Sequence, residues 1–181
     1  MSDGYIVENC SPTLAGIKTG NLFTVKVRDK RKLYGEIRKL NKTLTSKGLR
    51  AVPVRQTDGY ALIYLYRPDY LAKDISKPDV SEILRNKGYT CDNADICVMQ
   101  LIEHLSKDSC FPHEIGLFLG YPVADVKGFM EDSRKGVKLV GYWKVYGDKE
   151  KAKRTFNDYR RCTDYYRKAV RSGKSLEQLI R

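Results

Sequence analysis

The sequence predicts a single α+β domain, in which an antiparallel sheet of about four strands is wrapped by several helices. The chain has 181 residues, 41% of them hydrophobic, which is enough to build one substantial core. Apolar residues recur at helical spacing in several segments. The turn residues Thr57, Asp58 and Gly59 lie between two runs that are typical of strands, which indicates a β-hairpin.

The first elements are expected to be a short helix, a strand and a second helix. Ser11 followed by Pro12 is typical of a helix start, and Gly20 is typical of the end of that helix. Alternating apolar residues predict the first strand over 21–27. The second helix is predicted over about 29–47, because apolar residues recur there at spacings of three and four.

Two strands, over 49–56 and 60–67, form the predicted hairpin. The second of these strands is apolar on both faces, so we expect it to be central and covered on both sides. Two short helices follow, and their starts are marked by Pro68 and Pro78. A further helix is predicted over about 93–107 from the spacing of its apolar residues.

The segment 112–131 predicts two short helices joined by a tight turn. Gly116, Gly120, Val126 and Phe129 have the spacing of a helix-turn-helix unit, whose second helix enters a groove of DNA. The outward-facing residues of that second helix are mostly acidic, unlike those of a helix that reads DNA. We therefore favour a helix-turn-helix-like αα-hairpin that serves packing.

The last elements are expected to be a strand over 137–146 and a long helix over 148–171. Tyr142, Lys144 and Tyr146 share one face of that strand. Aromatic residues beside a lysine can stack nucleic-acid bases. They can equally form the core between a sheet and its helices, which is the interpretation we favour.

The predicted domain spans residues 9–171, between an N-terminal tail of residues 1–8 and a C-terminal extension of residues 172–181. No run of 18 apolar residues is present and the N-terminus does not resemble a signal peptide, so we expect a cytoplasmic protein without a membrane partner. The five cysteines contain no Cys-x-x-Cys pair, so neither a disulfide framework nor a metal site is expected.

The net charge of +12 is unevenly distributed. Residues 26–55 hold eleven Lys and Arg against two Asp and Glu, and residues 134–181 hold fifteen against five. Residues 56–133 between them are acidic, with seven Lys and Arg against thirteen Asp and Glu. This asymmetry suggests an anionic partner, such as nucleic acid, a phosphorylated ligand or an acidic protein. The alternative is that the basic residues are the solvated faces of two helices.

His113 and Glu114 follow Pro112 at an expected helix start, where exposed amides favour anions. His113 is a candidate general acid or base, and we name Glu114 as a second candidate catalytic residue. In the alternative interpretation, Glu114 interacts with the helix dipole and His113 packs locally. Leu117 stands where a zinc protease has its second histidine, so the sequence excludes that class of enzyme.

Cys10 precedes the expected capping residue Ser11, so a helix N-terminus would lower its pKa and make it a third candidate catalytic residue. The residues that follow are typical of a turn that holds phosphate or carboxylate, although the P-loop motif is absent. The candidate ligand-binding residues are Thr13, Lys18, Thr19, Asn21, Lys144 and Tyr146. The alternative is an ordinary helix stop and turn beside a buried Cys10.

Three blocks, at residues 10–23, 111–122 and 141–148, resemble one known family. They are CSPTLAGIKTGNLF, FPHEIGLFLGYP and GYWKVYGD, in this order along the chain. The family is the group of uncharacterised proteins of anaerobic Gram-positive bacteria called domain of unknown function 3793. The resemblance covers about residues 9–168 and implies no established activity.

The leading hypothesis is a protein that binds a small anionic ligand, with or without catalysis. Its site would combine the turn at residues 10–21 with His113 and Glu114. One alternative is a nucleic-acid-binding protein that uses the basic helices 29–47 and 148–171. The other is a structural or interaction module without a ligand. The sequence leaves the cofactor, the reaction and the oligomeric state open.

Overall fold

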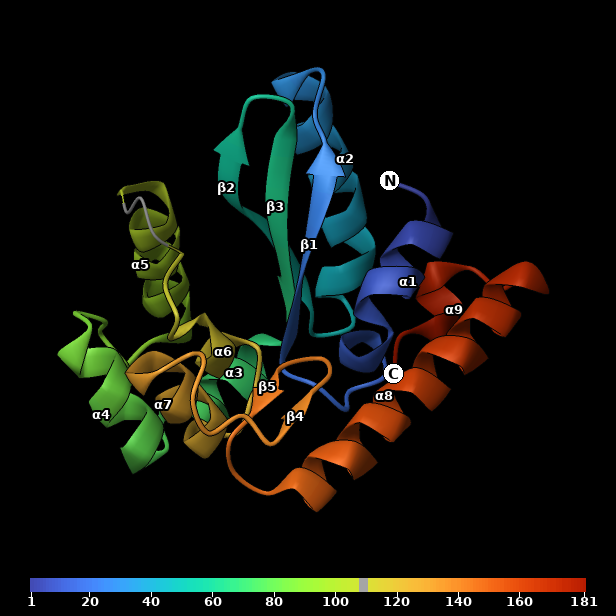
Figure 1. The fold of residues 1–181 in the computed structure, drawn as a ribbon. Helices are drawn as coiled ribbons and strands as arrows, with labels where there is room; N and C mark the ends of the chain where they lie inside the picture. Colours follow the sequence, from blue (N-terminus) through green and yellow to red (C-terminus); the bar gives the residue numbers. More distant parts are fainter. Residues whose placement is uncertain (108–110) are drawn as a thin grey trace.

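The computed structural model describes residues 1–107 and 111–181, and these form an α+β fold around one antiparallel sheet (Figure 1). The order of its strands is β1-β3-β2. The strands are β1 (Gly20–Lys26), β2 (Arg50–Thr57) and β3 (Tyr60–Tyr66). Strand β3 is central, and its residues from Ile63 to Tyr66 are buried. The predicted α+β class and the central position of this strand are therefore confirmed.

One face of the sheet is covered by helices from both ends of the chain. Helices α1 (Asp3–Leu14) and α2 (Lys30–Thr45) pack on this face and share a core with Phe23 and Ile63. Helix α8 (Lys149–Arg171) lies along α1, and α9 (Leu176–Leu179) joins the same core (Figure 1).

The other face is covered by the helices from the middle of the chain. These are α3 (Pro68–Ile75), α4 (Pro78–Asn86), α5 (Ala94–Lys107), α6 (Ile115–Phe118) and α7 (Val123–Glu131). Their core includes Tyr64 and Tyr66 of β3, whose rings stack at a centroid distance of 4.6 Å. The predicted αα-hairpin corresponds to α6 and α7, since a Cβ atom added at Gly116 would lie 2.8 Å from Val126. No described helix meets the length and hydropathy that a membrane span requires.

The segment 137–146 is not a strand of the main sheet, so the prediction of a fourth strand there is wrong. It forms a separate hairpin of β4 (Leu139–Val140) and β5 (Lys144–Val145) between α7 and α8. Val145, Ala152 and Phe156 form a small core of their own under this hairpin. The alternation predicted one continuous strand, but the backbone bends at 141–143 and the two short strands pair with each other.

The expected helix start at Ser11 is also wrong. Helix α1 begins eight residues earlier, at Asp3, and Pro12 lies inside it. The Ser2 hydroxyl caps the helix by accepting from the Tyr5 amide at 3.3 Å. Ile6 and Val7, which were expected in a tail, are buried in the core, as are Leu176, Leu179 and Ile180 of the expected extension.

Arg67 links the end of α1 to the C-terminal residue of the chain. Its guanidinium donates to the carbonyls of Thr13 and Leu14, at 2.8 and 2.9 Å, and also to the carbonyl of Arg181. The carbonyls of Thr13 and Leu14 lie in the last turn of α1, and the buried arginine adds to the bonds that they accept from the amides of Gly16 and Arg181. Burial lowers the pKa of Arg67.

Candidate functional site

A buried carboxylate positions the residues around a cleft that several charged side chains line. Asp125 of α7 is 3% exposed, and its Oδ2 accepts from the indole Nε1 of Trp143 at 2.7 Å. Its Oδ1 accepts from the amides of Tyr146 and Gly147 at 2.8 and 2.7 Å. These bonds hold the hairpin on α7 and stack Trp143 on Tyr121 at a centroid distance of 4.7 Å. We call the pair of Tyr121 and Trp143 the aromatic wall.

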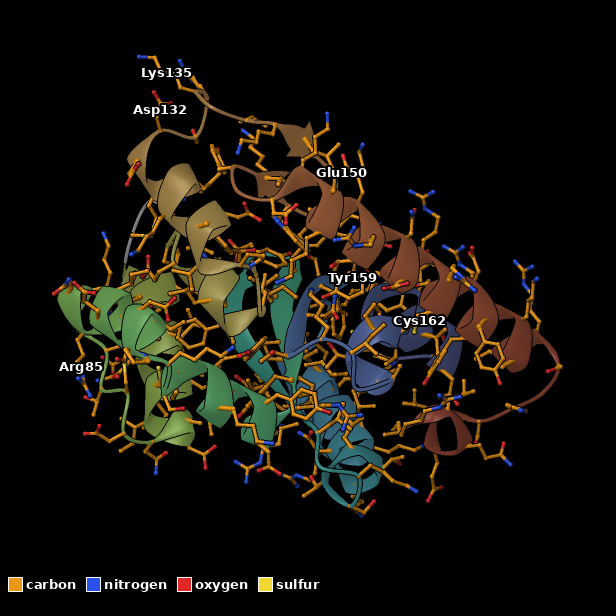
Figure 2. All side chains as sticks on the ribbon, turned by 90° about the horizontal axis from the view of Figure 1, so that it is seen from below. Arg85, Asp132, Lys135, Glu150, Tyr159 and Cys162 are labelled. Carbon is orange, nitrogen blue, oxygen red and sulfur yellow. The ribbon has the colours of Figure 1, made fainter. Side chains whose placement is uncertain are left out.

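A cleft of about 400 Å³, which we call the Lys18 cleft, lies on one side of the aromatic wall. It is bounded by the end of α3, the turn between α6 and α7, and the first turns of α8. Its lining includes Asp74, Lys77, Lys151 and Tyr159 besides the wall. Tyr159 lies on the side of α8 that faces the body of the protein (Figure 2).

Lys18 is 5% exposed and is not itself part of the lining, but it lies behind two residues that are, Tyr121 and Tyr159. Its ammonium is 5.2 Å from the ring centroid of Tyr121 and 5.9 Å from that of Tyr159, which are cation–π distances. It makes no ion pair or hydrogen bond with any residue that the structure describes. Burial lowers the pKa of Lys18 from 10.5 to about 8, while the neighbouring Cys10 acts weakly in the opposite direction. Lys18 is thus a buried cation without a counter-charge.

The acidic groups at the cleft, in contrast, have partners. Asp74 accepts from the hydroxyl of Thr19 at 2.5 Å and from the ammonium of Lys77 at 2.6 Å. Asp148 caps α8 by accepting from the amide of Lys151 at 2.9 Å. Helix α7 also begins at the cleft, after Pro122, and has no side-chain cap. The first amides of α7 are therefore donors at the cleft without a side-chain acceptor.

Gly120 allows the turn between α6 and α7 to approach Thr19. Its φ is +73°, and a Cβ atom there would lie 2.7 Å from the Thr19 hydroxyl. Gly48 has the same φ, with open space around it. We expect Gly48→Ala to lower the free energy of unfolding by about 1 kcal/mol through backbone strain alone. Gly120→Ala should cost about 1–2 kcal/mol more, because Thr19 must also move.

Urea denaturation of the two glycine variants measures this difference. Equal losses of stability in Gly48→Ala and Gly120→Ala would show that Thr19 moves aside without cost.

A second cavity, of about 360 Å³, lies on the other side of the aromatic wall, and we call it the His113 pocket. His113 is exposed and its ring meets Phe129 edge-on at 4.9 Å. The ammonium of Lys144 donates to the Ser133 carbonyl at 2.9 Å and lies 5.6 Å from the Phe129 centroid. The structure therefore brings His113 and Lys144 together, but on the opposite side of the wall from the Lys18 cleft.

Two of the predicted catalytic residues are placed differently from the sequence-based expectation. Cys10 lies within α1 and is fully buried, so burial raises its pKa and the predicted lowering by a helix N-terminus is wrong. Glu114 is 5% exposed, and its carboxylate contacts Tyr89 and His104. It accepts from the Tyr89 hydroxyl at 3.0 Å and lies 3.7 Å from Nδ1 of His104.

The remaining predicted ligand-binding residues make internal contacts. The Thr13 hydroxyl donates to the side-chain oxygen of Asn21 at 2.6 Å, so these two oxygens are paired inside the protein. The ring of Tyr146 covers Gly128, where an added Cβ atom would lie 2.5 Å from it. Of the turn residues, Lys18 and Thr19 lie beside residues that line the cleft.

The basic helices show where a nucleic-acid interface would have to lie. Helices α2 and α8 turn their apolar faces inward and leave most of their Lys and Arg exposed. Helix α7 is not available as a reader helix, because Asp125 and Gly128 hold the residues 143–147 against it. Nucleic-acid binding through α2 and α8 remains a prediction.

The model of the family described as "Protein of unknown function (DUF3793)" matches residues 6–180. The chain belongs to the DUF3793 family. No curated protein and no solved structure matches it. The DUF3793 match confirms the resemblance inferred from the three sequence blocks, and it includes the residues of both cavities.

Sequence reasoning missed the residues that build the walls of this DUF3793 protein's two cavities. Tyr121, Asp125 and Trp143 were not named as site residues, and neither were Asp74 and Tyr159. Trp143 offered one signal, since it is the only tryptophan of the chain. Asp125 offered another, because it is an acidic residue on a helix where the α6–α7 packing requires small and apolar neighbours.

Proposed function

We propose that this protein binds a small anionic ligand in the Lys18 cleft. The observation that carries the proposal is Lys18, a residue only 5% exposed whose ammonium lacks a counter-charge among the described residues. An unpaired charge in a protein interior is costly, and buried charges are therefore usually paired. A ligand anion in the adjoining cleft would provide the missing partner.

The lining itself holds Asp74, Asp125 and Asp148 besides the two lysines, so the attraction for an anion rests on Lys18 and on the free donors of the cleft. Lys77 and Lys151 line it, whereas Asp74 and Asp148 already accept hydrogen bonds from the protein. The first amides of α7, after Pro122, face an anion favourably because they carry the positive end of the helix dipole. The proposal concerns binding, and it includes neither Cys10 nor Glu114.

Isothermal titration calorimetry with sulfate at constant ionic strength tests this proposal. Sulfate keeps its charge over the relevant pH range, so a pH effect reports on the protein. We expect saturable binding at pH 7 that weakens as the pH rises above about 8, because Lys18 then loses its proton. Lys18→Met should weaken binding at least about tenfold, as expected for loss of a charged contact.

The control is Lys127→Met, which removes an exposed lysine of α7 that does not line the cleft. This variant should bind sulfate like the original protein. Equal sulfate binding by the original protein and Lys18→Met would overturn the proposal. It would also be overturned if neither sulfate nor inorganic phosphate bound to the original protein.

A further inference from the structure

We propose that the His113 pocket is a second, separate ligand site, which accepts a small planar aromatic molecule with an anionic group. The proposal does not depend on the Lys18 cleft, because it rests on the walls and charges on the other side of the aromatic wall. It joins His113 and Lys144 in a binding role and assigns no reaction to them.

The walls of the pocket match an aromatic ring. The rings of Tyr121, Phe129, Tyr142 and Trp143 line it, and apolar surface dominates the lining. Aromatic rings prefer stacked or edge-on contact with other rings, and such pairs add to the free energy of simple apolar burial. The volume of about 360 Å³ lies within the range of small-molecule sites, which are typically about 300–1,000 Å³.

The pocket is held open by fixed groups. Asp125 fixes the indole of Trp143 through the 2.7 Å hydrogen bond, and Trp143 in turn stacks on Tyr121. Gly116 contributes to the lining without a side chain, and a Cβ atom there would lie 3.1 Å from Tyr121. A ligand would therefore enter a cavity whose walls are already ordered, which reduces the entropic cost of binding.

The charges of the pocket favour an anionic group on the ligand. Asp125 lines the pocket, but both of its oxygens already accept hydrogen bonds from Trp143, Tyr146 and Gly147. Lys144 gives one N–H to the Ser133 carbonyl, and an ammonium has two more to donate. His113 is exposed beside it and would add a second donor. A carboxylate or sulfonate would meet these donors while its ring contacts the aromatic walls.

The test uses 1-anilinonaphthalene-8-sulfonate, a fluorescent aromatic sulfonate, as the probe. Trp143 is the only tryptophan and lines the pocket, so bound probe should quench its emission. We expect saturable quenching with one probe per chain. The non-fluorescent competitor 2-naphthoate should displace the probe, and the neutral 2-naphthalenemethanol should compete at least about tenfold less well, because it lacks the charge.

Two variants locate the bound probe. Lys144→Met keeps the aliphatic stem but removes the charge, and it should weaken probe binding about tenfold. Phe111→Ala shortens an exposed lining residue, so it should weaken binding without loss of folding. The matched control is Tyr165→Ala, which removes an exposed aromatic ring of α8 outside the pocket and should leave binding unchanged.

The proposal is overturned if probe binding leaves Trp143 emission unchanged, or if Lys144→Met and Tyr165→Ala bind the probe equally. It is also overturned if 2-naphthalenemethanol competes as well as 2-naphthoate. Sulfate, the probe of the Lys18 cleft, should not displace the aromatic probe. Failure of sulfate to bind would therefore leave this test unaffected, and the two proposals can fail separately.

Discussion

Replacement of Lys18 with methionine should stabilise the fold at pH 7 while it removes anion binding. Burial lowers the pKa of Lys18 from 10.5 to about 8, so the folded protein holds this proton less tightly than the unfolded chain. The shift corresponds to an unfavourable contribution of about 3 kcal/mol below pH 8. Loss of the cation–π contacts with Tyr121 and Tyr159 offsets about 1 kcal/mol of this. We expect a net gain of about 2 kcal/mol.

The pH dependence identifies the cause of this gain. Between pH 8 and 10.5 the unfolded chain still binds the Lys18 proton and the folded protein has released it, so the stability of the original protein rises with pH. The difference between Lys18→Met and the original protein should therefore be largest near pH 7. It should shrink as the pH approaches 10.5.

Urea denaturation of both proteins at pH 7 and pH 10 measures these free energies of unfolding. Lys127→Met is the control, because removal of this exposed lysine should change stability by less than about 0.5 kcal/mol. A destabilised Lys18→Met protein at pH 7 would mean that the contacts with the two tyrosines outweigh the cost of burial. Combined stabilisation and loss of sulfate binding would show that Lys18 serves the ligand at the expense of the fold.

Replacement of Asp125 with alanine should lower the free energy of unfolding by about 3–5 kcal/mol, because three donors lose their acceptor in a largely buried position. The same variant should release the hairpin from α7 and remove both cavities, since Trp143 lies in both linings. Urea denaturation followed by circular dichroism gives the loss of stability, and Trp143 emission reports the change in its environment. A loss below about 1 kcal/mol would contradict this role of Asp125.

The variant Asp125→Asn distinguishes the bond that Asp125 accepts from Trp143 from the bonds that it accepts from the two backbone amides. Its carbonyl oxygen can still accept from the amides of Tyr146 and Gly147, but its NH₂ group would face the indole N–H of Trp143. Asp125→Asn should therefore cost less than Asp125→Ala. Trp143→Phe removes the same indole bond, so combining it with Asp125→Asn should cost less than the sum of the single changes.

The periodic patterns of the sequence were sufficient to predict the elements whose packing partners lie close to them in the chain. The β2–β3 hairpin depends on a turn of a few residues around Gly59, and the α6–α7 pair depends on the spacing of Gly116 and Val126. The stripe that predicted the helix over 29–47 buries Leu33, Ile37 and Leu44 as expected. Each of these features depends on residues that lie close to one another in the sequence.

Contacts between distant segments decided the features that the sequence did not reveal. Pro12 and Gly20 suggested a helix between them, but the burial of Ile6 and Val7 against the core extends α1 to Asp3. The alternation over 137–146 predicted one strand, but the backbone bends at 141–143 and its two halves pair with each other, held by contacts with Asp125 and Phe156. Local propensity is weak compared with the burial of apolar surface.

By itself, the sequence determined the α+β class, the family and the central strand β3, because hydrophobic periodicity and long matching blocks are properties of the chain alone. It also identified Lys18, Thr19, His113 and Lys144 as candidate residues. Only the tertiary structure divided them between two cavities and placed Tyr121 and Trp143 as the wall between these cavities. The reason is physical, since the rings of Tyr121 and Tyr159 that cover Lys18 come from positions more than a hundred residues away in the chain.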